Sequence, residues 1–140
     1  MRNKVDACIC STKEPQIKFE ENKRKIVFGN PKHHAYKKVQ VDGCTITGAS
    51  VRCDKLLLSD DEHEERYVEL KGVDVMHAID QLEASIISLG EFDENRYSYV
   101  ICTNVAPAFT TQIQKKQALF YKKYKSRLVV REKQLTVPLN

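Results

Sequence analysis

The sequence lacks any hydrophobic run of the ~20 residues that a membrane-spanning helix requires. Residues 1–10 also lack the continuous apolar core of a secretory signal peptide. Both absences argue against a membrane or secreted protein, and we expect a cytoplasmic protein with no membrane partner. What the sequence does contain, 41% hydrophobic and 30% charged residues over 140 positions, predicts a single globular domain with a substantial core.

Paired cysteine knuckles are also missing. A structural zinc site usually uses two C-x₂₋₄-C pairs, whereas only Cys8 and Cys10 are close together here, so a site made with Cys44 and Cys53 has weak support. Free cysteine is among the most buried residue types. With five cysteines in all, we expect reduced thiols in or near the core, Cys102 in a core strand, and no structural Zn²⁺.

The pattern of apolar residues predicts two parts of one domain that spans 1–140. Within residues 1–50, segments such as 16–20 and 36–41 alternate between polar and apolar, which predicts a β-rich N-terminal elaboration. After Gly72 the hydrophobic period changes from two to about 3.6 residues, which predicts a helix with Asp74 as its N-cap and Gly90 at its end. The predicted elements are a tail or edge strand over 1–12, strands over 16–20, 25–28, 36–41, 44–47, 96–102 and 127–131, and helices over 75–89 and 110–125.

Two further apolar segments, 51–58 and 66–72, are separated by the strongly polar residues 59–65. A polar connection of this length between two short strands predicts a β-hairpin. If Leu58 pairs with Arg66, the start of the first strand lies beside the end of the second, and Asp54 lies opposite the neighbourhood of Leu70.

Asp54, Glu69 and Lys71 converge in that arrangement, because Glu69 and Lys71 share one face of their strand and Asp54 lies within a residue of both. Two carboxylates suit Mg²⁺, which takes few protein ligands and fills its shell with water and phosphate oxygen. An adjacent ammonium can orient a water molecule and offset charge on a phosphate. The alternative is a solvated hairpin with an ordinary cross-strand ion pair.

Asp54, the tripeptide Glu69-Leu70-Lys71 and Gln81 on the following helix resemble the motif of the PD-(D/E)xK nuclease superfamily. The resemblance covers roughly 51–139, where the order strand, strand, helix, strand, helix, strand is similar to the family core. It implies a restriction-endonuclease-like α/β fold, with a mixed central sheet flanked by helices and residues 1–50 added. The chain departs from the family in having Cys53 before the aspartate and no acidic helix before the hairpin.

The resemblance implies a Mg²⁺-dependent nuclease that hydrolyses phosphodiester bonds, most simply as a DNA endonuclease, with Mn²⁺ as a cation that can replace Mg²⁺. Asp54 and Glu69 would be metal ligands, with the Leu70 carbonyl as an extra ligand. Lys71 would be catalytic, and Gln81 would support the site. Small family members often form homodimers, because two symmetric sites cut a duplex.

Charge is divided along the chain. Acidic residues dominate 54–94, whereas Lys and Arg dominate 95–140, where Glu132 is the sole acid. A basic region beside an acidic, metal-attracting one fits a nuclease. The lysines expected to contact nucleic acid lie on the second helix: Lys115, Lys116, Lys122 and Lys123. The alternative is that these lysines only solvate the helix.

Two other functions stay open. The chain can be a non-catalytic nucleic-acid-binding module with the same fold, or a zinc-stabilised interaction module built on its cysteines. The loop histidines His33 and His34 are expected to be exposed rather than metal ligands. Intact Asp54, Glu69 and Lys71 favour the enzyme.

Overall fold

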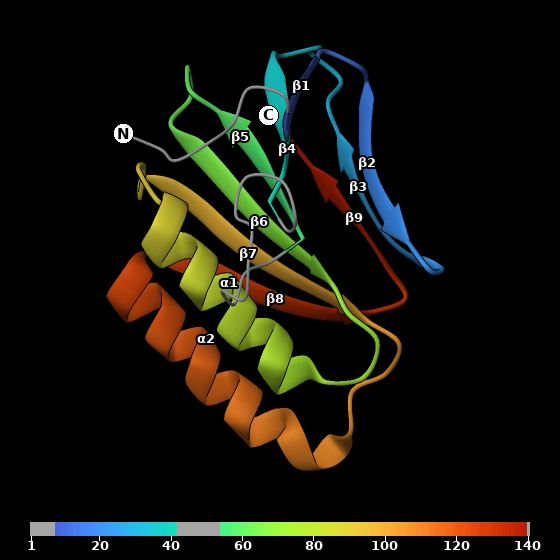
Figure 1. The fold of residues 1–140 in the computed structure, drawn as a ribbon, viewed down its shortest axis with the longest axis vertical. Helices are drawn as coiled ribbons and strands as arrows, with labels where there is room; N and C mark the ends of the chain where they lie inside the picture. Colours follow the sequence, from blue (N-terminus) through green and yellow to red (C-terminus); the bar gives the residue numbers. More distant parts are fainter. Residues whose placement is uncertain (1–7, 42–53, 140) are drawn as a thin grey trace.

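The computed structural model of the chain describes residues 8–41 and 54–139 (Figure 1). The elements before the central hairpin are β1 (Ile9–Thr12), β2 (Gln16–Glu21), β3 (Arg24–Gly29) and β4 (Tyr36–Gln40). Those that follow are β5 (Lys55–Ser59), β6 (Glu64–Leu70), α1 (Val75–Leu89), β7 (Asn95–Cys102), a 3-10 turn (Pro107–Phe109), α2 (Thr110–Tyr124), β8 (Ser126–Glu132) and β9 (Gln134–Pro138). No helix in these ranges is both long enough and apolar enough to cross a membrane.

The elements form three layers. A six-stranded sheet in the order β1-β4-β5-β6-β7-β8 lies in the middle. Helices α1 and α2 pack together on one face of it (Figure 1), and a three-stranded sheet, β2-β3-β9, packs on the other. The predicted mixed α/β architecture is therefore confirmed, but both described helices lie on the same face.

The middle sheet is mixed because its two halves are connected differently. Strands β4, β5 and β6 form an antiparallel meander, whereas β6, β7 and β8 run parallel, with α1 and α2 as the crossovers between them. Parallel strands need such crossovers, and their carboxyl ends meet at one edge of the sheet. In open α/β sheets that edge is the usual place for a ligand.

Helix α1 has the bounds that the sequence predicts. The Asp74 carboxylate accepts a hydrogen bond from the His77 backbone N–H (3.0 Å), which satisfies one donor of the first turn. The helix ends at Gly90, whose N–H donates to the Ile86 carbonyl (2.8 Å). The predicted apolar face, which includes Ile79 and Leu82, is fully buried against the middle sheet.

Four predictions from the sequence need correction. Strand β6 begins at Glu64 rather than Arg66, and strand β9 was not foreseen.

Cys8 is disulfide-bonded, so the expectation that all thiols are reduced is wrong, and Cys8 is not available to a four-thiolate zinc site. An odd number of cysteines does not exclude one pair. Cys10 is an exposed free thiol rather than a core residue, whereas Cys102 is buried and free as expected. Cys44, Cys53 and the strand predicted over 44–47 lie outside the described residues.

Glu65 on β6 is fully buried and hydrogen-bonded through both carboxylate oxygens. One oxygen accepts from Arg96 Nε (2.9 Å) and from the Tyr67 hydroxyl (3.0 Å). The other accepts from the backbone N–H groups of Glu91 (2.7 Å) and Phe92 (2.8 Å), which follow α1. A buried carboxylate is tolerated only when it is paired in this way, so Glu65 ties β6, β7 and the end of α1 together.

Replacing Glu65 with Ala should lower the free energy of unfolding by about 3–5 kcal/mol, because Arg96 and two backbone donors lose their buried acceptor. Urea unfolding followed by circular dichroism measures this. The control is Glu94→Ala, which removes an exposed contact to His63 and should cost about 0–1 kcal/mol. Equal losses in the two variants would contradict the role given to Glu65.

A second buried network predicts how stability depends on pH. Burial raises the pKa of the Tyr99 hydroxyl from 10.0 to about 12, although the adjacent Arg66 guanidinium opposes the shift. The folded state therefore keeps this proton where the unfolded state loses it, so stability should fall as pH rises from about 10 to 12. Urea midpoints measured over this range should fall less steeply for Tyr99→Phe than for the unmodified protein, and an unchanged slope would exclude Tyr99 as a contributor.

Candidate active site

Asp54 and Glu69 lie opposite each other in the central hairpin. The observed register pairs Lys55 with Val68 at this end of β5 and β6, so the next positions along are Asp54 and Glu69. Leu58 pairs with Glu65 rather than with Arg66, and the predicted register was therefore wrong by one residue. The correction places the two carboxylate residues directly across from each other and on the same, helix-facing side of the sheet.

Two hydrogen bonds hold these residues in a reciprocal arrangement. The Asp54 backbone N–H donates to Glu69 Oε1 (3.0 Å), and the Leu70 backbone N–H donates to Asp54 Oδ2 (2.9 Å). Glu69 is 2% exposed, whereas Asp54 is half-buried. Each carboxylate is therefore oriented by the backbone beside the other, which keeps the two acidic groups together despite their like charge.

Leu70 and Lys71 complete this end of β6. The Lys71 N–H donates to the Ile101 carbonyl (2.9 Å) and therefore faces β7. The backbone groups of the preceding residue face the other neighbour, so both the N–H and the carbonyl of Leu70 point toward Asp54. Alternation puts the half-buried Lys71 side chain on the Glu69 face, where its ammonium forms no ion pair with any residue of the described ranges.

The site lies at the edge where the parallel strands end. Thr103, directly after β7, donates its N–H to the Gly72 carbonyl (2.7 Å), so the β6 and β7 ends stay side by side past the last paired residues. Helix α1 starts three residues after Gly72, with its first turn capped by Asp74. The arrangement gathers carboxylates, an ammonium and a helix start at one edge, as in α/β proteins that bind ligands there.

The donor atoms fit a hard divalent cation. Asp54 and Glu69 supply carboxylate oxygens, and Leu70 supplies a peptide carbonyl on the same side of the strand. Mg²⁺ suits such a set because it binds one or two carboxylates and keeps water or phosphate in the remaining positions. No cluster of three or more His, Cys, Asp or Glu side chains suited to a metal occurs within 8–41 and 54–139, so a closed, all-protein metal site is not found in those ranges.

Gln81 and His77 lie on α1 rather than on the strands that carry Asp54, Glu69 and Lys71. Gln81 is half-buried in α1, about 9 Å along the axis from Val75 at a rise of ~1.5 Å per residue. His77 is exposed in the first turn. A supporting role for Gln81 stays a prediction.

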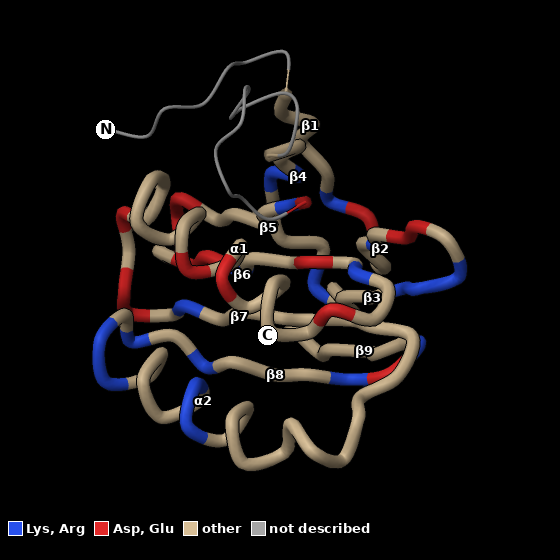
Figure 2. Tube along the Cα trace, turned by 60° about the horizontal axis from the view of Figure 1, so that its bottom comes forward, with Lys and Arg blue, Asp and Glu red and all other residues tan. Residues whose placement is uncertain are grey.

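The four lysines of α2 do not gather around the carboxylates. Figure 2 shows basic positions along α2 and β8 and acidic positions on β6 and α1. Arg96 at the start of β7 donates to the carbonyl of Tyr124 (2.8 Å), so the C-terminus of α2 lies at the amino end of β7, away from the site. Lys122 and Lys123 sit in that last helical turn, where they also favour the helix dipole. Their contact with nucleic acid stays a prediction, as does that of Lys115 and Lys116.

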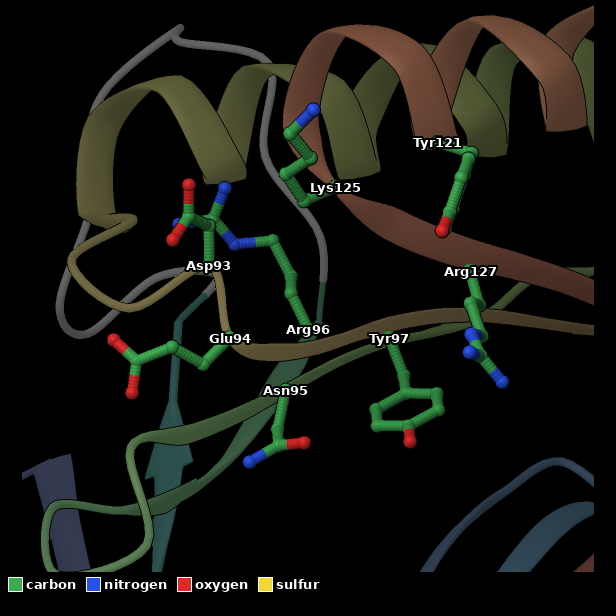
Figure 3. A pocket seen from close by; sticks show the side chains of 8 residues that line it. All are labelled: Asp93, Glu94, Asn95, Arg96, Tyr97, Tyr121, Lys125 and Arg127. Atoms are coloured by element: carbon green, nitrogen blue, oxygen red, sulfur yellow. The ribbon is translucent and has the colours of Figure 1, made fainter.

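The sequence did not predict the hollows around Tyr97, a residue on the sheet face opposite the helices. Figure 3 shows Tyr97 and Arg127 projecting from adjacent strands away from the helices, and together with Tyr121 and Lys125 at the end of α2 they line a hollow of about 320 Å³. Tyr97 also lines two neighbouring hollows of about 250 and 340 Å³. The signal in the sequence was the spacing of Tyr97 with Tyr99 and of Arg127 with Arg131, which puts each pair on one face of its strand.

Comparisons with known proteins covered family models, curated proteins and solved structures. No protein-family model matches the chain. No curated protein matches it, and neither does a solved structure.

Proposed function

We propose that the chain is a divalent-cation-dependent nuclease that hydrolyses phosphodiester bonds in nucleic acid, with Asp54, Glu69 and Lys71 as its catalytic centre. The observation that carries the proposal is the reciprocal pair of backbone hydrogen bonds between the Asp54 and Glu69–Leu70 segments. These bonds place two carboxylates side by side, next to a lysine, at the ligand-binding edge of the sheet. An ordinary cross-strand ion pair would not bring two acids together.

The carboxylates of Asp54 and Glu69 and the carbonyl of Leu70 would hold Mg²⁺. When bound, the cation supplies Lewis-acid stabilisation of a phosphate oxygen and lowers the pKa of water. The backbone N–H groups already fix one oxygen of each carboxylate, so little side-chain entropy remains to be lost on binding.

Lys71 contributes positive charge on the same face as Glu69. Its ammonium can donate hydrogen bonds to an attacking water molecule and to a phosphate oxygen that gains charge in the transition state. The strand fixes the backbone of Lys71 through Ile101, which limits how far the ammonium can move. In this proposal Lys71 orients the water molecule and the phosphate, whereas Asp54, Glu69 and Leu70 hold the cation. Substitutions can therefore test the two roles separately.

DNA is the proposed substrate, and cutting both strands of a duplex would need two copies of this single site. A homodimer is therefore part of the proposal. Gln81, half-buried on α1, is the proposed supporting residue, and the α2 lysines are proposed phosphate contacts.

Asp54→Asn and Glu69→Gln should each lower the rate of Mg²⁺-dependent cleavage by at least ~10²-fold, because they remove charge from the cation site. Both amides keep an oxygen that can accept the backbone hydrogen bonds, so the fold should persist. Single-turnover cleavage of plasmid and single-stranded DNA, with Mg²⁺, Mn²⁺ or EDTA, measures the effect.

The matched control is Asp80→Asn, which removes a charge from an exposed position of α1. Its rate should stay close to that of the unmodified protein. Unchanged cleavage in both Asp54→Asn and Glu69→Gln would exclude the proposed centre. Nucleic-acid binding without any cleavage in the unmodified protein would instead favour the non-catalytic binding module.

Lys71→Ala should slow cleavage by about 10²- to 10³-fold, because a preorganised cationic donor is lost. The affinity for the cation should be kept, since Asp54 and Glu69 remain. Lys71→Arg should not restore the rate, because a planar guanidinium cannot occupy the position of a compact ammonium or release a proton near neutral pH. Titration of Mg²⁺ into each variant separates the two effects, and full activity of Lys71→Arg would limit the residue to a charge role.

A further inference from the structure

The last two strands of the chain diverge and leave a groove between the two sheets. Strand β8 is one edge strand of the six-stranded sheet, and β9 is one edge strand of the three-stranded sheet. They are joined at Lys133 and separate from there (Figure 1). The groove between them has a volume of about 340 Å³, within the usual range for ligand sites.

The lining of this groove has a distinct composition. It contains three arginines, two tyrosines and no acidic residue, although the chain carries nearly as many acids as bases. The residues are Arg66, Tyr97, Tyr99, Arg127, Val129, Arg131, Leu135, Thr136, Val137 and Pro138. Guanidinium groups favour anions, especially phosphates, and the tyrosines and β9 side chains offer apolar and aromatic surface.

Arg66, Tyr97 and Arg127 form a row across three adjacent strands, because each is register partner to the next. The buried Arg66 is fixed by Glu64 and by a hydrogen bond to the Tyr99 hydroxyl (2.6 Å). Its Cζ lies 4.0 Å from the centroid of the Tyr97 ring. The ring is therefore held in place by a cation–π contact on its β6 side.

Arg127 and Arg131 provide the exposed charge of the groove. They lie on one face of β8, four residues apart, which corresponds to about 13 Å at ~3.3 Å per residue. Arg127 forms no ion pair with the part of the chain that is described, and the Arg131 guanidinium donates only to the adjacent Val130 carbonyl (3.0 Å). A row of charge of this length suits a chain of phosphates better than a single anion.

We propose that this groove binds single-stranded nucleic acid, with a base stacked against Tyr97 and two phosphates of the same strand bound by Arg127 and Arg131. Aromatic rings interleaved with arginines give this kind of binding because every base has a flat face and every nucleotide carries a phosphate. The choice of nucleic acid over other polyanions deepens the proposed function and rests on it. The groove itself lies on the face of the sheet away from α1 and α2.

The groove also leads toward the carboxylate edge. Arg131 pairs in register with Ile101, and Ile101 pairs with Leu70, which follows Glu69. Arg131 is thus two strands from β6, or about 10 Å at ~4.8 Å per strand. A strand held by Arg127 and Arg131 runs along β8 toward the end of the sheet where the proposed chemistry takes place.

The test is binding of a fluorescent 12-nucleotide single strand in EDTA, where a cation-dependent cleavage cannot occur. The double variant Arg127→Ala/Arg131→Ala should bind at least ~10-fold more weakly and lower the slope of log affinity against log salt by about 1.4, since each phosphate contact to a single strand contributes ~0.7. Tyr97→Leu should weaken binding by roughly tenfold with an unchanged salt slope, because stacking is lost and charge is not.

The matched control, Lys13→Ala/Lys18→Ala, removes the same charge from the β1–β2 region, away from the groove, and should bind within about twofold of the unmodified protein. Equal loss in both double variants would mean that only net charge matters and would overturn the groove. So would equal affinity for inorganic phosphate or a mononucleotide, which would indicate a small-anion site. Absence of binding by the unmodified protein would also overturn it.

Failure of the groove and failure of the nuclease are distinguishable. Asp54→Asn should lose Mg²⁺-dependent cleavage but bind the single strand in EDTA as tightly as the unmodified protein does, whereas Arg127→Ala/Arg131→Ala should lose that binding in EDTA, where no cleavage occurs. Thermal unfolding followed by circular dichroism verifies that each variant is folded. If Tyr97→Leu fails to fold because Arg66 loses its contact, the exposed arginine pair still decides the result.

Discussion

Strand β6 is buried along its whole length, and burial forces each of its charged side chains to be paired. Glu65 meets this requirement on the helix face through Arg96 and the backbone after α1. Glu64 and Arg66 meet it on the other face by pairing with each other and with Tyr36 and Tyr99. The strand is central to both cores, so these pairs fix how the helices and the second sheet are placed against it.

The buried carboxylate of Glu69 is also hydrogen-bonded, and here one donor is a backbone N–H group. Its carboxylate accepts from the Asp54 backbone, while the Asp54 carboxylate accepts from Leu70. Backbone N–H groups neutralise charge only in part, and the two adjacent carboxylates that they orient are the basis of the proposed cation site. Glu65, in the first half of the same strand, is instead paired with Arg96, and the proposed centre lies at the carboxyl end of the strand.

The two proposed sites use opposite faces of one sheet and opposite charge. The carboxylates face the helices, whereas Arg66, Tyr97 and Arg127 face the second sheet. That second sheet packs over Val68, Leu70 and Ile101 and diverges from β8 beyond Lys133, so the arginines of β8 stay accessible. Segregating the charges between faces would let one small domain bind the proposed anionic substrate and cation without mutual neutralisation.

The sequence by itself determined most of the local elements and the residues of the proposed centre. Helix α1 has a one-sided apolar stripe, a capping aspartate and a terminal glycine, and these are local signals that no distant contact had to supply. Alternation likewise located β2 and β4, short apolar runs located β3 and β7, and the proximity of Asp54 to Glu69 followed from a hairpin. The exact register did not follow, because a polar loop of uncertain length permits a shift by one residue.

Only the tertiary structure decided how the N-terminal strands assemble, with β2 and β3 joined by the distant β9 as a separate layer, while β1 and β4 extend the main sheet. It also decided the disulfide at Cys8 and the groove between β8 and β9. These features depend on which surfaces meet across long stretches of chain. Periodicity reports the face that a residue occupies, and it carries no information on the partner of that face.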